Sequence, residues 1–140
     1  MGKSLKNSRI LIIIAAAYFL LMAAFASLSP IYLRLVSPEA VTVEISGGYM
    51  DGKWYYLIVP EEAITEINGE YFVYTPVFKK TFWVSGTYCK SCKVSIAAKN
   101  ISEGSESTVA ITSDEITDRN LVIVRWSKPL IDGCRIFIQE

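Results

Sequence analysis

The chain has 140 residues with 14 lysines and arginines, 14 aspartates and glutamates, and no histidine, the side chain most often used as a neutral-pH general base and transition-metal ligand. Most hydrolase and metalloenzyme schemes are therefore harder to build from it. All 14 acids but only 11 of the 14 bases follow residue 28, so this part carries 11 − 14 = −3 charges, and a slightly acidic surface argues against a nucleic-acid partner.

The N-terminal part contains a long apolar run. Residues 10–26 carry no charge, and their one polar group is the phenol of Tyr18. With its flanks, this run spans ~26–29 Å as an α-helix, close to the ~30 Å hydrocarbon core of a bilayer. Residues 10–29 are therefore predicted to form a transmembrane helix. Ser29-Pro30 is expected to end it, because proline cannot continue the hydrogen-bond ladder.

The residues before this run predict its orientation. Lys3, Lys6 and Arg9 occur there without an acid, so the positive-inside rule places residues 1–9 in the cytoplasm and the rest of the chain outside the plasma membrane. The alternative is a cleaved signal peptide, since residues 24–26 have the small-x-small form of a cleavage site. Both alternatives export the same domain.

The remainder predicts one all-β domain at residues 40–140, joined to the helix by a stalk at residues 30–39. Short β-rich segments occur there at roughly 8–14-residue intervals between turn signals, which is typical of a small antiparallel β-barrel or sandwich. The segments predicted as strands are 41–46, 53–59, 71–74, 81–84, 92–98, 108–112, 121–126 and 134–138.

Local patterns predict individual turns and faces. Asp51-Gly52 and Asn68-Gly69 suit the positive dihedral angles of two-residue hairpins, and Gly47-Gly48 is a further turn signal. The apolar residues of segment 41–46 alternate with polar ones, which predicts that Val41, Val43 and Ile45 face the core.

Three short stretches of sequence follow one another after residue 53, and their order is informative. They are Val59-Pro60-Glu61-Glu62-Ala63-Ile64 before a hairpin and Tyr71-Phe72-Val73-Tyr74; residues 94–98 followed by 109–111; and residues 121–124 followed by Leu130-Ile131-Asp132-Gly133-Cys134-Arg135-Ile136. This order resembles the C-terminal, membrane-proximal β-barrel region of membrane fusion proteins, the HlyD-like periplasmic adaptors of efflux and export systems. The resemblance covers residues 53–140 and departs from the family pattern at residues 113–120.

The resemblance implies an all-β fold and an adaptor that docks to a transporter. The 140 residues have no room for the lipoyl-like domain or the long helical hairpin of the family, so the resemblance does not imply that this chain bridges to an outer-membrane duct.

Three cysteines are the candidate reactive groups. Cys89-Lys90-Ser91-Cys92 has the spacing of a thiol-disulfide redox site, but no helix is predicted beside it to lower a thiol pKa. A structural disulfide, within the motif or from one of its members to Cys134, and free thiols are the other interpretations. Three sulfurs without histidine leave a structural zinc site short of its fourth ligand unless an aspartate or glutamate is recruited, and a copper(I) trithiolate is the other metal alternative.

Aromatic residues are the candidate docking groups. Trp54, Tyr56, Tyr71 and Tyr74 lie in two predicted strands, where alternation sends about half of the side chains outward. The alternatives are a packed core with cross-strand aromatic pairs and an exposed patch that docks a protein or rests at lipid headgroups.

The sequence therefore predicts a single-pass, non-catalytic membrane adaptor or accessory subunit without a cofactor. Its expected partners are the lipid bilayer, a membrane transporter or another membrane subunit, and a second copy of the chain in a homo-oligomer. The alternatives are a membrane-tethered thiol oxidoreductase that uses Cys89 and Cys92, and a pilin-like filament subunit with an apolar N-terminal helix.

Overall fold

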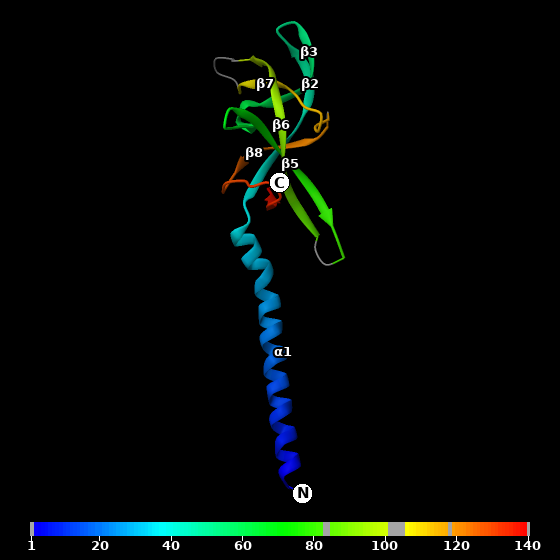
Figure 1. Ribbon diagram of the computed structural model, residues 1–140, viewed down its shortest axis with the longest axis vertical. Helices are drawn as coiled ribbons and strands as arrows, with labels where there is room; N and C mark the ends of the chain where they lie inside the picture. Colours follow the sequence, from blue (N-terminus) through cyan, green and yellow to red (C-terminus); the bar gives the residue numbers. More distant parts are fainter. Residues whose placement is uncertain (1, 83–84, 101–105, 118, 140) are drawn as a thin grey trace. The chain divides into compact units, whose positions relative to one another are not determined.

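The computed structural model describes residues 2–82, 85–100, 106–117 and 119–139. The chain divides into two compact units, Met1–Val36 and Ser37–Glu140. The elements, shown in Figure 1, are α1 (Gly2–Val36), β1 (Glu39–Glu44), β2 (Ser46–Met50), β3 (Lys53–Pro60), the 3-10 helix η1 (Glu61–Ala63), β4 (Ile64–Ile67), β5 (Glu70–Lys80), β6 (Ser85–Asn100), β7 (Thr108–Thr112), β8 (Leu121–Trp126) and β9 (Arg135–Ile138).

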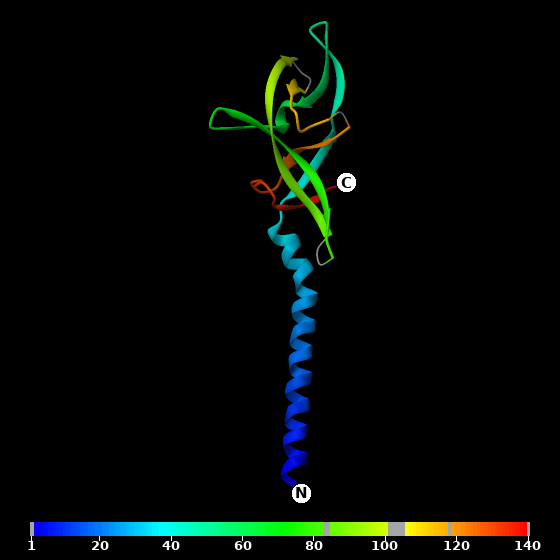
Figure 2. The ribbon, with the colours of Figure 1, turned by 45° about the vertical axis from the view of Figure 1, so that its right-hand side comes forward.

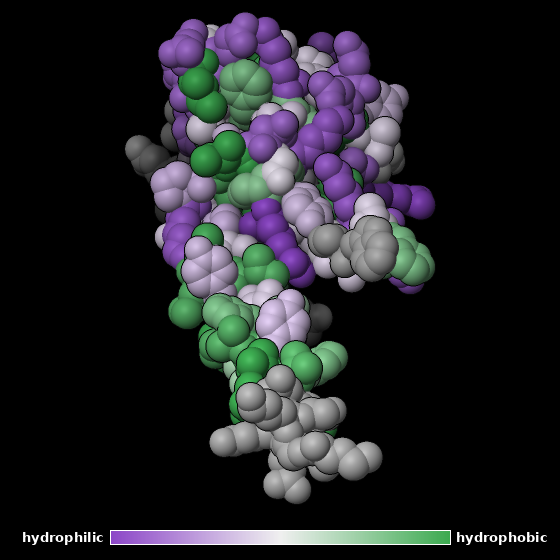
Figure 3. Space-filling model, turned by 60° about the horizontal axis from the view of Figure 1, so that its bottom comes forward, coloured by the Kyte–Doolittle hydropathy of each residue, from purple (hydrophilic) through white to green (hydrophobic). Residues whose placement is uncertain are grey.

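The first unit is the single helix α1. Within the described residues, its segment Ile10–Val36 is long and apolar enough to cross a membrane. The side chains of this segment are exposed to solvent in the isolated chain, and Figure 3 shows hydrophobic residues over most of its visible face. Solvent-exposed apolar side chains on this scale are typical of a helix whose natural surroundings are lipid.

The predicted end of the helix is wrong. Pro30 lies inside α1, which continues to Val36, so residues 30–36 of the predicted stalk are helical. Proline removes one backbone hydrogen bond, but the apolar run resumes after it at Ile31 and the bonds on both sides of the proline keep the helix continuous. The helix also begins before residue 10, at Gly2.

The second unit is a curled, mostly β structure. In the described residues its strands form one sheet with the order β2-β3-β7-β6-β9-β1-β8, and β5 pairs with both β4 and β6. Figures 1 and 2 show the sheet curled around its own axis, as half of a barrel that stays open. The predicted all-β class with one N-terminal helix is confirmed, whereas the sheet stays open and does not close into a barrel.

One pairing departs from the predicted antiparallel sheet. Strands β1 and β9 are parallel, with Glu39 opposite Phe137 and Ala40 opposite Ile138. These strands lie at opposite ends of the β unit in the sequence, so no tight hairpin forces them to run in opposite directions. Because β9 pairs with β6 on its other side, it joins β1 and β8 to the rest of the sheet.

Both predicted two-residue hairpins are confirmed. Asp51 and Gly52, with φ of 52° and 75°, connect β2 to β3. Asn68 and Gly69, with φ of 53° and 80°, connect β4 to β5. Positive φ at both central residues defines the type I′ turn, whose twist matches that of the paired strands.

Other local predictions need correction. Gly47-Gly48 is not a turn but part of β2, and Val43 is exposed although the alternation placed it in the core. Val43 shares its face with Val41, and both line a groove beside Val124 that is open to solvent, so alternation predicted the face correctly but not its coverage.

The remaining strand predictions differ mainly in length. Segments 108–112 and 121–126 match β7 and β8, whereas segment 92–98 is the second half of the 16-residue strand β6. Of the segment predicted as a strand at 81–84, Thr81 and Phe82 are not in a strand and residues 83–84 lie outside the described residues.

The core consists of two clusters. The first contains Ile45, Leu57, Val59, Ala63, Val73, Cys92, Val94, Val109, Ile111, Ile116, Val122 and Val124. The second contains Ala40, Tyr74, Cys89, Ile123, Leu130 and Ile136. Strand β8 contributes neighbouring residues to both clusters, Val122 to the first and Ile123 to the second. Since successive side chains of a strand point to opposite faces, β8 is buried on both faces at this point. Strand β6 contributes Cys89 to the second cluster and, further along the strand, Cys92 and Val94 to the first.

Candidate functional site: an aromatic hairpin and a cysteine strand

Three aromatic side chains are exposed on the β2–β3 hairpin. Tyr49, Trp54 and Tyr56 are 76%, 46% and 74% exposed, and we call them the hairpin aromatic surface. Tyr49 lies opposite Trp54 in the strand pairing, and their ring centroids are 4.9 Å apart in an edge-to-face arrangement. Trp54 and Tyr56 are two residues apart on β3, so they project from the same face of the hairpin.

The hairpin positions these rings through local sequence. The two-residue turn at Asp51-Gly52 sets the register that places Tyr49 opposite Trp54. A Cβ atom added to Gly47 would lie 3.0 Å from Cζ2 of Trp54 and 3.1 Å from the carbonyl oxygen of Tyr55. The indole therefore lies directly against the backbone of Gly47. A residue with a side chain at position 47 would need the space that the indole occupies. Sequence reasoning found Trp54 and Tyr56 but missed Tyr49, whose signal was its cross-strand position.

The other two predicted docking residues are placed differently. Tyr74 is only 6% exposed and packs edge-to-face with Trp126 in the second core cluster, so its assignment to a docking surface is wrong. Burial raises its pKa, and the neighbouring Cys89 adds to the effect. Tyr71 is half-buried against the first cluster. Both belong to β5, which does not pair with β3 in the described residues, so they do not join the hairpin aromatic surface.

A cleft of about 490 Å³ lies beside the hairpin. Strand β3 pairs with β7 at residues 58–60, and residues 53–57 line the cleft together with Ile111 and Ile116. Trp54 and Tyr56 belong to its lining. The hairpin thus presents aromatic rings next to a partly apolar hollow, an arrangement that suits an anchoring side chain of a protein partner.

A second groove, of about 530 Å³, has valines and glutamates in its lining. Val41, Val43 and Val124 lie beside Glu61 and Glu62 there. The carboxylate of Glu62 accepts a hydrogen bond from Nε of Arg125 at 3.0 Å, and Glu61 forms an ion pair with Lys99. Exposed pairs of this kind contribute little to stability. The glutamates are surface charges with cationic neighbours, as expected for solvated loop acids.

The Cys89-Lys90-Ser91-Cys92 motif lies entirely within β6. Cys89 and Cys92 are both buried, but they are three residues apart, and an odd offset on a strand sends side chains to opposite faces. Accordingly, Cys89 belongs to the second core cluster and Cys92 to the first. The motif therefore does not bring its two sulfurs together, and a disulfide within it would require the strand to be rebuilt.

The third cysteine lies directly beside the first. The sulfurs of Cys89 and Cys134 are 3.2 Å apart, and Sγ of Cys89 also donates to the carbonyl oxygen of Ile131 at 2.8 Å. Burial, followed by the contact with Cys134, raises the pKa of Cys89 to about 12. A thiol with such a pKa stays protonated at neutral pH and is a weak nucleophile, unlike the attacking thiol of an oxidoreductase.

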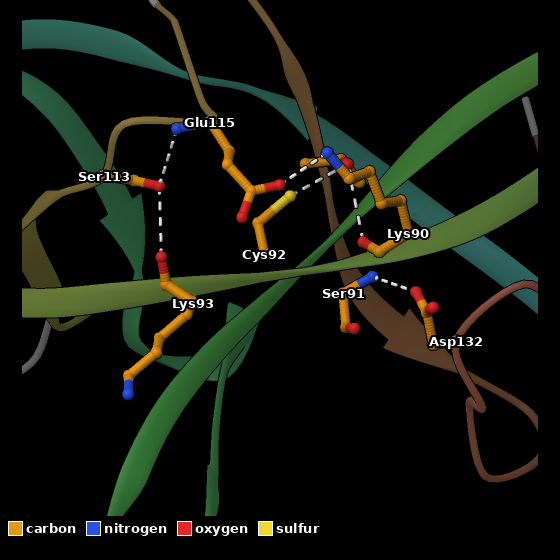
Figure 4. A network of polar contacts seen from close by, with 8 residues as sticks. Lys90, Ser91, Cys92, Lys93, Ser113, Glu115 and Asp132 are labelled. Carbon is orange, nitrogen blue, oxygen red and sulfur yellow. Dashed lines mark hydrogen bonds and ion pairs between the residues drawn. The ribbon is translucent and has the colours of Figure 1, made fainter.

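Polar contacts hold the motif on both sides (Figure 4). The backbone N–H of Ser91 donates to Oδ1 of Asp132 at 2.7 Å, which ties β6 to the turn before β9. This hydrogen bond is the main cause of a lowered pKa for Asp132. On the other side Lys90 pairs with Glu115, and Oγ of Ser113 donates to the carbonyl oxygen of Lys93 at 3.1 Å. Both motif cysteines thus lie in a restrained segment of backbone.

Within the described part of the chain, no three side chains of the metal-binding types His, Cys, Asp and Glu lie close enough to hold an ion together. The three cysteines do not form such a group because Cys92 lies in the first core cluster, whereas Cys89 and its neighbour Cys134 lie at the second.

Comparisons with known proteins identify no relative: no protein-family model, no curated protein and no solved structure matches the chain.

Proposed function

We propose that the protein is a non-catalytic, membrane-anchored adaptor whose β unit docks to another membrane protein through the hairpin aromatic surface. The observation that carries this proposal is the exposure of Tyr49, Trp54 and Tyr56 on one hairpin, next to a hollow. Tyrosine and tryptophan are among the residues most enriched at the energetic centres of protein interfaces, because they offer large apolar area and a polar tip with few rotatable bonds.

The apolar helix supplies the second half of the mechanism. The segment Ile10–Val36 has the length and composition of a membrane anchor, and the basic residues before it favour a cytoplasmic N-terminus with the β unit on the outer side of the plasma membrane. An anchor confines the β unit to the membrane surface and raises its effective concentration near a membrane partner. Weak contacts of the aromatic hairpin then suffice for stable association.

The order of motifs that resembles membrane fusion proteins favours a transporter as the partner. In this chain, the Val59-Pro60 block ends β3 and leads through η1 to the hairpin at Asn68-Gly69. We therefore propose a transporter or an associated export subunit in the same membrane. The burial of both motif cysteines on opposite faces of β6 supports a docking function over a thiol oxidoreductase.

Site-specific photo-crosslinking in native membranes tests this proposal. A photoreactive residue at position 56 is expected to give one predominant adduct with an integral membrane protein. The Tyr49→Ser/Trp54→Ser change in the same chain is expected to abolish that adduct. The matched control carries the photoreactive residue at Phe78, which is also exposed but lies on β5. Equal adducts from both positions, or none from position 56, would contradict docking through this hairpin.

The proposed orientation has its own test. In sealed vesicles with the outer face exposed, protease added outside is expected to remove a C-terminal epitope and to spare an N-terminal one. Protection of the C-terminal epitope would contradict the proposed orientation without bearing on the aromatic surface itself.

A further inference from the structure

The turn before β9 lies against the middle of β6. Thr87 is opposite Ile136 and Tyr88 is opposite Arg135 in the antiparallel pairing, so the same register places Cys89 directly opposite Cys134. Backbone hydrogen bonds fix this relationship: the N–H of Cys89 donates to the carbonyl oxygen of Cys134 at 2.9 Å, and that of Gly133 donates to Cys89 at 2.8 Å. The two cysteines are thus a cross-strand pair held by the main chain.

The side chains of this pair already point toward each other. Their sulfurs are 3.2 Å apart, so a bond of ~2.0 Å needs an approach of only about 1 Å. Cross-strand neighbours have Cβ atoms close to the separation that a disulfide requires, whereas residues on opposite faces of one strand do not. Cys92 lies across the strand, where its sulfur is 3.7 Å from Oγ1 of Thr75.

We propose that Cys89 and Cys134 form an intramolecular disulfide and that Cys92 remains a reduced, buried thiol. The disulfide fastens β9 to β6. Strand β9 has only four residues and pairs at two positions with β6 and at two with β1, yet its Ile136 is a fully buried core residue. A covalent bond compensates for this small number of pairings at the C-terminal strand.

The chemistry is thiol–disulfide exchange with a low-molecular-weight disulfide as the oxidant. Cys134 is half-buried whereas Cys89 is fully buried, so the thiolate of Cys134 is the first attacking group. It displaces one thiolate from the oxidant and forms a mixed disulfide. Cys89 then loses its proton and attacks the sulfur of Cys134, which releases the second thiolate. Two protein thiols are oxidised, and the two released thiolates take up the two protons.

Trypsin makes the pairing directly measurable, because the sequence places each cysteine on its own peptide: residues 81–90, 91–93 and 126–135. The reduced, full-length chain in detergent is equilibrated with excess oxidised glutathione, quenched in acid, alkylated in denaturant, digested and analysed by mass spectrometry. The expected result is peptide 81–90 linked to peptide 126–135, with peptide 91–93 alkylated. A bridge that contains peptide 91–93, or alkylation of all three peptides, would overturn the proposal.

Matched variants extend the test to stability. Oxidation is expected to raise the melting temperature of the β unit by about 10 °C. The reason is that the disulfide joins two residues 45 positions apart and so restricts the unfolded chain. Cys92→Ala is expected to keep this shift and Cys134→Ser to lose it. Both variants are compared with their own reduced forms, so a loss of packing in either one does not affect the comparison. An unchanged melting temperature on oxidation of the Cys92→Ala variant would contradict the stabilising role of the bond.

Discussion

Cys89 and Cys92 lie three residues apart on one strand, yet their side chains belong to two different core clusters on its opposite faces. The same spacing at the tip of a helix brings two sulfurs together, because three residues make nearly one turn there. On a strand it separates them, because the side-chain period is two. The motif therefore contributes to the packing of both faces of β6, and the sulfur contact of Cys89 is with the distant Cys134.

Reduced Cys89 is expected to react slowly with alkylating agents. Its pKa is raised to about 12 by burial, so only a small fraction is thiolate at pH 8.5. Even after allowing for the greater nucleophilicity of a thiolate with a high pKa, we expect alkylation about 100-fold slower than for the same residue in the denatured chain. Time-resolved mass spectrometry of the tryptic peptide 81–90 measures both rates, and equal rates in the folded and denatured chains would contradict the burial of this thiol.

Ile123→Ala is expected to lower the free energy of unfolding by ~2–5 kcal/mol, because the deleted atoms leave a cavity in the second core cluster. Ile131→Ala is the matched control. Its side chain is 72% exposed, and we expect a change within ~0.5 kcal/mol. Urea denaturation of the full-length chain in detergent, followed by tryptophan fluorescence, measures the free energy of unfolding of both variants. Equal losses for the two variants would show that Ile123 is not in the core.

The hairpin at Asn68-Gly69 tests backbone strain without side-chain contacts. Gly69 has φ of 80°, and apart from Gly69 and its two chain neighbours no residue has an atom within 4 Å of a Cβ atom added there. Gly69→Ala is therefore expected to cost ~1–2 kcal/mol through the left-handed backbone alone. Asn68→Gly keeps the positive φ of 53° accessible and is expected to change stability by less than ~1 kcal/mol. The same denaturation measurement compares them, and a Gly69→Ala chain as stable as the Asn68→Gly chain would contradict the type I′ geometry.

Acid is expected to weaken the attachment of β6 to the turn before β9. The hydrogen bond from the Ser91 N–H lowers the pKa of Asp132 below its ordinary value. A lowered pKa means that the folded chain binds the proton less readily than the unfolded chain. The stabilisation is therefore complete above pH ~4 and is lost as the pH falls through the folded-state pKa.

The variant that tests this is Asp132→Asn, which should show a shallower loss of unfolding free energy between about pH 5 and pH 2 than the wild type. Asp114→Asn removes the same charge from an exposed loop and controls for net charge. Denaturation curves at each pH measure the slopes. Identical slopes for the wild type and Asp132→Asn would exclude a contribution from this carboxylate.

Local features of this protein are readable from its sequence. The apolar run that starts at Ile10, the hairpins at Asp51-Gly52 and Asn68-Gly69 and the mostly β class all follow from interactions between residues close in the chain. Turn dihedral angles and apolar periodicity are local properties, so a single sequence is enough to predict them. Pro30 is the instructive exception, because a local rule predicted the end of a helix that its neighbours continue.

Long-range pairing was decided only by the tertiary structure. The parallel contact of β1 with β9, the register shift at Val41 and the open edge of the sheet depend on strands far apart in sequence. The same is true of the exposure of Tyr49, the burial of Tyr74 and the partnership of Cys89 with Cys134. A strand pattern states which residues share a face, but which face is buried and what lies opposite are set by the partner strand.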